Sequence, residues 1–366
     1  MKKKLLALFL VAAMIFGLTA CGKTSSQTGI TADNGTTAAS EDGTTADAQT
    51  EPAKVEGCDF NIASLKGPTS IGLVKLFSDS DAGNTVNKYN YSIYGTADEI
   101  STGMVKGDLD VAAVPCNLAS VLYNKTEGQV VIAAVNTLGV LYIVEKGEEL
   151  GSIADLKGKT IYTTGQGTTP EYTLRYLLSQ NGLDPDKDVT IEFCSEASEV
   201  VSTIATMDSA VAMLPQPYVT VAQTKVDGLK VAFDVTKEWE KADKDSTVVT
   251  GVLIARKAFI EEHPEQFKAF LDEYKASAEY ANSNVEDTAE LVESFDIFKA
   301  AIAKKAIPEC NVTFITGDDM KTKVSSYLKV LFDANPKAVG GKLPDDGIYY
   351  VCLLYTSPSP RDLSTS

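Results

Sequence analysis

Two stretches of the chain share one pattern, in which a run of apolar and β-branched residues breaks at glycines and then takes on helical spacing. The stretches cover residues 60–73 and 159–172, and a shift of 100 residues places Gly67 on Gly167. Short apolar runs that end at glycine predict buried strands, and the leucine spacing after them predicts helices. The pattern therefore predicts a strand, a glycine turn and a helix twice, in the same order.

The second of these helices has the clearer signals. Thr169 is expected as its N-cap and Pro170 as its first residue, because a threonine hydroxyl can accept a bond from an unpaired N–H and proline has no N–H to leave unpaired. A stripe of leucines follows, and Gly182 is expected to end the helix. This helix would therefore start directly after the glycine turn.

The same register continues through residues 96–115 and 196–215, which align without a gap and agree at six positions. Each segment predicts a short helix followed by a buried strand that ends at Pro115 or Pro215. The order of strand, glycine turn, helix, strand, helix and strand is that of a parallel α/β unit. Two such units predict two similar lobes.

The glycine turns are the expected place for a ligand. In open parallel sheets, ligands bind beyond the carboxyl ends of the strands, where both turns lie. Two facing lobes would present two helix N-termini to one cleft. Unpaired N–H groups there, with threonine and serine hydroxyls, favour a small ligand that has acceptor atoms or negative charge.

The two ends of the chain depart from this pattern. Residues 1–20 resemble a bacterial lipoprotein signal, with three lysines, an apolar run too short to span a bilayer, and a lipobox before Cys21. Cleavage would leave Cys21 carrying lipid, with palmitate among its acyl chains; an ordinary signal is the alternative. Residues 21–56 contain almost no large apolar side chain and predict a flexible tether. Residues 351–366 resemble translated sequencing-adapter DNA and are interpreted as non-native, with a short native tail as the alternative.

Composition narrows the range of partners. The formal net charge is −17, and so acidic a chain repels phosphate backbones, which argues against a nucleic-acid partner. Solubility is the simpler explanation of this charge. The cysteines of the folded part are widely spaced and contain no C-x-x-C, which leaves open whether they are small buried residues or form a disulfide. They are Cys58, Cys116, Cys194 and Cys310.

Five features carry a resemblance to a known family. They are the lipobox, the Gly67-Pro68-Thr69-Ser70 turn, DLDVAAVPCNLAS at 108–120, IADLKGKTI at 153–161 and LIARKAFIEEHPEQFKAFL at 253–271. In this order they resemble the extracytoplasmic solute-binding proteins of ABC importers, of the nitrate, sulfonate and thiamine-precursor class. The resemblance covers nearly all of residues 57–350.

The resemblance implies an α/β fold of the two-lobed periplasmic-binding-protein-like kind (type II), in which each lobe is a mostly parallel sheet flanked by helices. The first lobe would comprise residues 57–143 and 251–350 and the second residues 144–250, with hinge strands near 141–145 and 248–255. It further implies a lipid-anchored monomer on the outer face of the bacterial cell membrane, which delivers a small-molecule solute to a permease and its ATPase subunit. No cofactor, metal or enzymatic activity is expected.

Position along the repeat marks the residues expected to line the ligand cleft. They are Thr69, Ser70, Asn117, Gly167, Thr168, Thr169, Gln216 and Tyr218. Asn117 has a simpler interpretation as a helix N-cap, and Tyr218 as a core residue. Because Arg175 and Arg256 are the only arginines before the adapter-like tail, an arginine clamp is not expected. The ligand stays open between a compact anion and a flat heterocycle such as a pyrimidine.

Other function classes fit the sequence less well. Gly165-x-Gly167 resembles part of a dinucleotide-binding turn, with Glu196 as the ribose-binding acid, but Pro170 stands at the third glycine position. The one histidine, His263, lies away from the proposed cleft, which disfavours a pyrimidine-synthesising enzyme of similar fold that relies on a histidine. A lipid-anchored ligand-binding sensor is the alternative from another class.

Overall fold

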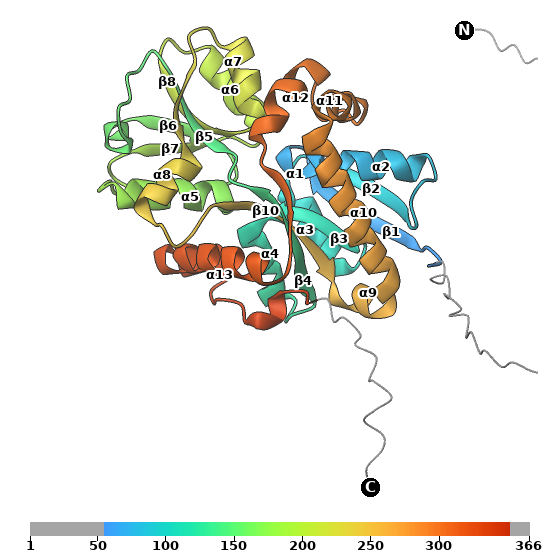
Figure 1. The fold of residues 1–366 in the computed structure, drawn as a ribbon. Coiled ribbons are helices and arrows are strands. Elements are labelled where there is room, and N and C mark those ends of the chain that lie inside the picture. Colours follow the sequence, from blue (N-terminus) through green and yellow to red (C-terminus); the bar gives the residue numbers. More distant parts are fainter. Residues whose placement is uncertain (1–54, 352–366) are drawn as a thin grey trace, which may run out of the picture. The chain divides into compact units, whose positions relative to one another are not determined.

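The structure is a computed structural model that describes residues 55–351. The signal segment, Cys21, nearly all of the tether and the adapter-like tail after residue 351 lie outside the described residues, so the predictions about them stay predictions. The described residues form two β-sheets flanked by helices (Figure 1). Within residues 55–351, no helix has the length and apolar character needed to span a bilayer.

In the described chain, the first sheet has six strands in the order β11-β4-β10-β3-β1-β2. They are β1 (Asp59–Leu65), β2 (Lys88–Tyr94), β3 (Val111–Pro115), β4 (Val130–Leu138), β10 (Val249–Arg256) and β11 (Val312–Ile315). β1 pairs in parallel with β2 and β3, whereas β10 runs antiparallel between β3 and β4. A strand from late in the chain thus fills the middle of a sheet built from the early part.

The second sheet repeats this arrangement with five described strands, in the order β7-β6-β8-β5-β9. They are β5 (Leu141–Lys146), β6 (Thr160–Thr163), β7 (Thr190–Phe193), β8 (Ala210–Pro215) and β9 (Lys230–Asp234). β6 pairs in parallel with β7 and β8, and β5 runs antiparallel between β8 and β9. Four strands in each sheet point the same way, which confirms the predicted fold of two lobes with mostly parallel sheets.

Helices connect and cover the strands (Figure 1). Those that precede the second sheet are α1 (Pro68–Ile71), α2 (Val74–Asp81), α3 (Ala97–Lys106) and α4 (Cys116–Lys125). Those that accompany the second sheet are α5 (Thr169–Gln180), α6 (Ala197–Ala205), α7 (Tyr218–Lys225) and α8 (Val235–Ala242). After β10 come α9 (Lys257–Glu262), α10 (Pro264–Ser283), α11 (Val285–Ser294), α12 (Ala300–Ala306) and α13 (Gly317–Ala334). Helix α5 begins one residue earlier than predicted, with Thr168 at the N-cap.

Four short 3-10 turns complete the described elements. They are Ile153–Leu156, Ile307–Glu309, Pro336–Val339 and Asp346–Ile348. The last of these turns is followed by a bridge between Tyr349 and Ile132 of β4. The end of the described chain therefore lies against the first sheet.

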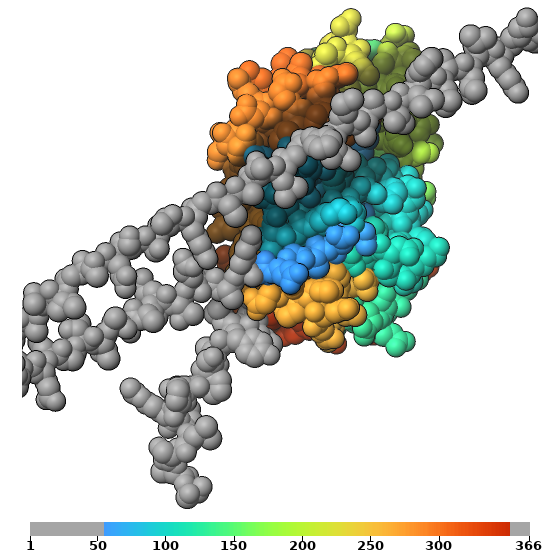
Figure 2. All heavy atoms as spheres, turned by 90° about the vertical axis from the view of Figure 1, so that its right-hand side faces the viewer, coloured from blue at the N-terminus to red at the C-terminus, as the bar shows by residue number. Residues whose placement is uncertain are grey.

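The first lobe is held together by a core rich in aromatic rings. Phe60 of β1 packs edge-on against Phe259 of α9, with ring centroids 4.6 Å apart. Figure 2 shows the same neighbourhood from outside, where the gold segment that contains α9 lies against the blue segment of β1. The chain therefore returns to the first sheet after it has built the second.

A second core crosses from one lobe to the other. Trp239 of α8 is fully buried between Tyr176 of α5 and Tyr327 of α13, with ring centroids 4.3 and 5.3 Å away. The hydroxyls of Thr173 and Tyr327 lie 2.8 Å apart across the same interface. Because α13 packs on β4 and β10 while α5 and α8 belong with the second sheet, the lobes share an apolar interface on this side.

The chain passes between the sheets at two places. Gly139 and Val140 join β4 to β5, and residues 243–248 join α8 to β10. A Cβ atom at Gly139 would collide with the hydroxyl of Thr236, so this passage has no room for a side chain. The predicted lobe boundaries, at 143/144 and 250/251, fall near these passages and stay predictions.

Candidate ligand-binding site

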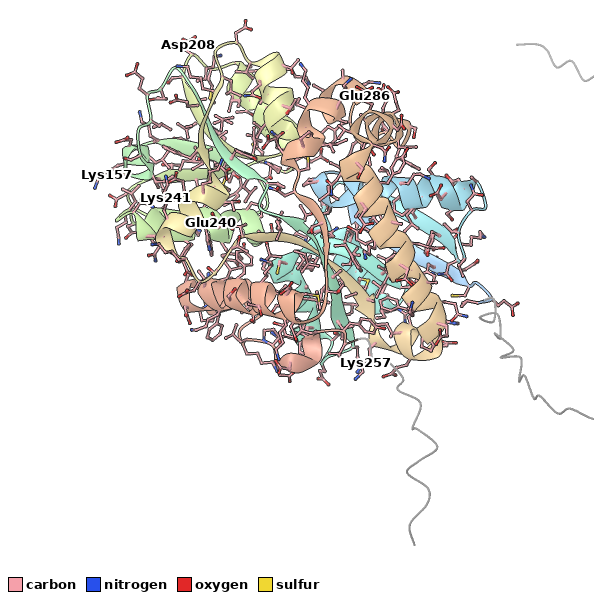
Figure 3. The ribbon with its side chains drawn as sticks, viewed as in Figure 1. Lys157, Asp208, Glu240, Lys241, Lys257 and Glu286 are labelled. Carbon is pink, nitrogen blue, oxygen red and sulfur yellow. The ribbon has the colours of Figure 1, made fainter. Side chains whose placement is uncertain are left out.

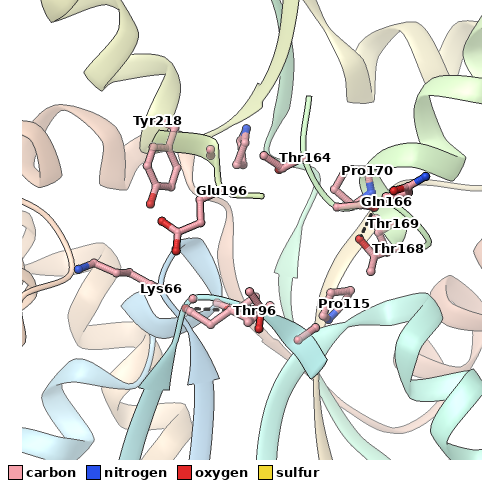
Figure 4. A pocket seen from close by; sticks show the side chains of 18 of the residues that line it. Lys66, Thr96, Pro115, Thr164, Gln166, Thr168, Thr169, Pro170, Glu196 and Tyr218 are labelled. Carbon is pink, nitrogen blue, oxygen red and sulfur yellow. Dashed lines mark hydrogen bonds between the residues drawn. The ribbon is translucent and has the colours of Figure 1, made fainter. Parts of the chain in front are cut away.

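A cavity of about 430 Å³ lies between the two lobes, at the carboxyl ends of their parallel strands. This volume suits a small organic ligand. Its walls come from the turns after β1, β2 and β3 in the first lobe, the turns after β6, β7 and β8 in the second, and the starts of β5 and β10. In Figure 4, Tyr218 and Glu196 of the second lobe face Lys66, Thr96 and Pro115 of the first. Equivalent turns of the two repeated units thus meet at one cleft.

Four of the eight predicted residues line this cavity, namely Thr69, Thr168, Thr169 and Tyr218. The ring of Tyr218 packs edge-on against Phe298, with centroids 4.9 Å apart. Burial is the main cause that raises the pKa of the Tyr218 hydroxyl, and the nearby Glu196 raises it further. Tyr218 therefore presents a neutral aromatic face to the cavity at pH 7.

The other four predicted residues, Ser70, Asn117, Gly167 and Gln216, do not line the cavity, and three of them are buried while Gly167 is exposed. Ser70 is fully buried, and its hydroxyl bonds to that of Ser64 at 2.7 Å. Gln216 Oε1 accepts bonds from the backbone N–H and the hydroxyl of Thr220, at 3.3 and 3.0 Å. Asn117 and Gly167 bond to each other. In this structure the three buried residues pack beneath the lining, and Gly167 lies on the surface outside it.

Asn117 ties three segments together. Its Nδ2 donates to the carbonyls of Gly167 at 3.3 Å and Ala338 at 3.0 Å, and its Oδ1 accepts a bond of 3.2 Å from the hydroxyl of Thr169. It lies in the first turn of α4, whereas Pro115 occupies the N-cap position that the sequence suggested for Asn117. Because the side chain is fully buried, each of these bonds replaces one to water. Asn117 therefore fixes the second glycine turn against the first lobe.

The glycines of the two turns differ in backbone conformation and in their position relative to the cavity. Gly67 has an extended backbone and lines the cavity, and a Cβ atom there would meet nothing within 4 Å. Gly167 has a φ of +74°, and its N–H donates to Glu171 Oε2 at 2.7 Å. A positive φ strains residues that carry a Cβ atom. The backbone therefore requires glycine at position 167, whereas a side chain at position 67 would occupy open space beside the cavity.

Several polar residues of the cavity were not predicted. They are Lys66, Thr96, Asp98, Thr164, Gln166, Ser195, Glu196 and Thr250. Lys66, Thr164 and Gln166 flank the two glycine turns, so including whole turns would have found them. Thr96, Asp98, Ser195 and Glu196 lie in or beside the turns after β2 and β7, where the sequence predicted no residue of the ligand cleft. Thr250 comes from the strand that returns to the first sheet, and its hydroxyl is buried without a hydrogen-bond partner.

Neither arginine of the described chain lines the cavity. Arg175 pairs with Glu171 and Asp186, both at 2.7 Å, and Arg256 pairs with Asp110 at 2.5 Å. A ligand in the cavity therefore meets no guanidinium group. Within residues 55–351, no three side chains of histidine, cysteine, aspartate or glutamate are grouped so that they could hold a metal ion.

All four cysteines of the described chain are free thiols. Cys116 and Cys310 are buried, which agrees with their interpretation as small core residues. Cys194 is partly exposed and lines the cavity, and burial is the main cause that raises the pKa of its thiol. Cys194 is therefore mainly protonated at pH 7 and can still report on access to the cavity.

The fold is that of two-lobed binding proteins of ABC importers. It matches the crystal structure of an ABC transporter protein from Parabacteroides distasonis with a TM-score of 0.66 and 24% identity, over 80% of this chain and 98% of that one. It matches the periplasmic aliphatic sulphonate binding protein SsuA from Escherichia coli with a TM-score of 0.63 and 14% identity, over 77% and 90% of the two chains. For the periplasmic nitrate-binding protein NrtA from Synechocystis PCC 6803 the TM-score is 0.54 at 13% identity, over 65% and 66%. At these identities the likeness establishes the fold.

The sequence comparisons agree with the fold. Residues 117–287 match the family model described as NMT1/THI5 like. A Brucella abortus (strain 2308) protein named as a binding protein is 26% identical over 174 residues, which are 48% of this chain and 52% of that protein. The match thus spans about half the length of the relative. The resemblance to the nitrate, sulfonate and thiamine-precursor class of solute-binding proteins is confirmed.

Proposed function

We propose that this protein is the solute-binding component of an ABC importer, which captures a small solute between its lobes and delivers it to a permease and its ATPase subunit. The observation that carries the proposal is the cavity of about 430 Å³ between the lobes, walled by equivalent turns of two repeated α/β units. Proteins of the same fold are named for binding sulphonate and nitrate. The cavity offers hydroxyls and an aromatic ring for recognition, from Thr69, Thr168, Thr169 and Tyr218.

The proposal includes a place in the cell. The protein would be a monomer on the outer face of the bacterial cell membrane, held by lipid on Cys21 and free to move on the tether of residues 21–56. The lipobox and the composition of the tether support this, as do the periplasmic proteins of the same fold. Cys21→Ser should release folded protein from the membrane fraction. A variant that still sediments with membranes would contradict the anchor.

A screen of small solutes against the full-length protein tests the function itself. A solute at 100 times its dissociation constant should stabilise the fold by about 2.7 kcal/mol, which a thermal shift detects. Small-angle scattering should then show a more compact protein, because closure of two lobes around a ligand is a common response of two-lobed proteins. Absence of any stabilising solute among sulfonates, nitrate, bicarbonate, amines and pyrimidines would overturn the proposal.

A further inference from the structure

The cavity carries more negative than positive charge. Its charged lining residues are Lys66, Asp98 and Glu196. The ammonium group of Lys66 lies 3.6 Å from the carboxylate of Asp296, which is outside the lining, and the Lys66 side chain is 41% exposed. Solvent screens all three groups, because Asp98 and Glu196 are exposed as well, and Asp296 further weakens the pull of Lys66 on a ligand. A bare anion in the cavity would therefore meet two carboxylates and one shared cation.

Acidic side chains of the protein itself lie at the helix N-termini that border the cavity, and they oppose the partial positive charge there. At the start of α5, Glu171 accepts a bond of 2.7 Å from the N–H of Gly167, and at the start of α6, Glu199 accepts one of 2.8 Å from the N–H of Ser195. Helix α3 carries Asp98 in its first turn. Helix N-termini attract anions through free N–H groups and partial positive charge, and the negative charge of these carboxylates offsets part of that attraction.

Glu196 is the acid that reaches across the cleft. It stands at the N-cap of α6, and its Oε1 lies 2.9 Å from the place that a Cβ atom on Gly95 of the first lobe would occupy. Figure 4 shows its carboxylate directed towards the first lobe, near the ring of Tyr218. Ser198 donates a bond of 3.2 Å to Oε2. An ionised carboxylate accepts about four hydrogen bonds, so Glu196 has acceptor capacity left for a ligand.

The surroundings of Glu196 suit a positively charged nitrogen group. A carboxylate beside a neutral aromatic ring attracts such a group twice, through charge-assisted hydrogen bonds and through the electron-rich face of the ring. Tyr218 supplies that ring. In the first lobe, the buried and unpartnered hydroxyl of Thr250 offers a contact for another polar atom of the same solute.

We propose that the cavity selects a small organic solute that carries a cationic nitrogen group, such as an ammonium or amidinium, that Glu196 binds this group, and that compact anions are disfavoured. The inference rests on the proposed function, because it takes the cavity to be the solute site. It reverses the preference for acceptor atoms or negative charge that the helix N-termini alone would give.

Three planar probes of nearly equal size separate charge from shape: benzamidine is a cation, benzamide is neutral and benzoate is an anion. Calorimetry on the full-length protein should show benzamidine binding about tenfold or more tightly than benzoate. Glu196→Gln should weaken benzamidine about tenfold and leave benzamide unchanged. The matched control Glu240→Gln, at an exposed acid on α8 that does not line the cavity (Figure 3), should change neither affinity.

Protection of Cys194 from alkylation, read by peptide mapping, shows whether a probe occupies the cavity. Benzoate binding more tightly than benzamidine, or full benzamidine affinity in Glu196→Gln, would overturn the charge preference and leave the proposed function standing. Failure of all three probes to protect Cys194, combined with no stabilising solute in the wider screen, would overturn the proposed function as well.

Discussion

The two lobes are built from the same α/β unit, yet they place different side chains at the cleft. The first glycine turn, at Gly67, leads into a helix of 4 residues, and the second, at Gly167, leads into one of 12. Where the first lobe has Thr96 as the N-cap of α3, the second has Glu196 as the N-cap of α6. The repeated unit therefore determines where the cleft lies, and single positions within the unit determine what it can bind.

The antiparallel strand inside each sheet, β10 in the first and β5 in the second, shows a second contrast. Gly251 of β10 pairs with Pro115, and Leu141 of β5 pairs with Pro215 at the equivalent place. A Cβ atom at Gly251 would lie only 2.6 Å from Asn136 Oδ1. The first sheet thus has no room for a side chain where the second sheet buries a leucine.

The largest effect is expected at this pair of strands. Gly251→Val would press a side chain against Asn136 and Thr69, both buried, and should lower the free energy of unfolding by about 3 kcal/mol. Leu141→Val removes one methylene from a buried site and should cost about 1 kcal/mol. Urea denaturation measures both. Equal losses of unfolding free energy in the two variants would show that β10 and β5 tolerate substitution equally, and would contradict the difference in available space.

The next effect is expected at the amide that joins the lobes. Asn117→Ala would leave the carbonyls of Gly167 and Ala338 without their partner and should lower the free energy of unfolding by about 2 kcal/mol. Gln216→Ala in the second lobe removes bonds only to Thr220, four residues away, and should cost about 1 kcal/mol. Chemical denaturation compares the two. A loss for Asn117→Ala no larger than that for Gln216→Ala would contradict its role as an interlobe tie.

Substitutions in the two glycine turns should have smaller effects, on stability at one turn and on ligand affinity at the other. Gly167→Ala introduces a Cβ atom at positive φ and should cost about 1 kcal/mol of stability, with little change in the affinity of the folded variant. Gly67→Ala should leave stability unchanged and weaken binding of the best solute from the screen, because the methyl group takes up space beside the cavity. Denaturation and calorimetry separate the two. Loss of binding in a stable Gly167→Ala variant would favour the place in the ligand cleft that the sequence suggested for Gly167.

The smallest effect is expected at the end of the chain. Tyr350 donates its backbone N–H to the carbonyl of Ile132 at 2.8 Å, and its ring packs edge-on against Phe267 at 5.0 Å. Ending the chain after Tyr350 keeps these contacts and should leave the melting temperature unchanged. Even about 1 kcal/mol of lost stability would lower it by about 2 °C, which scanning calorimetry resolves. A drop of several degrees would show that residues 351–366 are native and packed.

Most of the fold could be predicted because its signals are local. Apolar runs, glycine breaks and strand-ending prolines recur within each unit, so the order of elements in residues 59–115 and 160–215 follows from the sequence. The direction in which a single side chain points depends on tertiary packing, which local patterns do not encode. Ser70 bonds to Ser64 inside the core because α1 ends after one turn and packs on β1, which no periodicity of four residues reveals.

The candidate site was harder to predict than the fold because it forms between distant segments. Glu196 could be seen as the counterpart of Thr96, but its approach to Gly95 depends on how the two lobes face each other. Thr250 reaches the cavity only because β10 returns to the first sheet. Residues of the glycine turns were found in part, whereas those of the turns after β2 and β7 and of the return strand were not.

The position of β10 determines the order in which the protein can fold as it is synthesised. This strand lies between β3 and β4, but the ribosome reaches residues 249–256 only after it has made all of β5 to β9. Until then β3 and β4 have no strand between them, and their facing edges lack hydrogen-bond partners. The strands of the second sheet are contiguous, from residue 141 to residue 234, and can pair as soon as they emerge. The lobe that comes later in the sequence is therefore the first that can be completed.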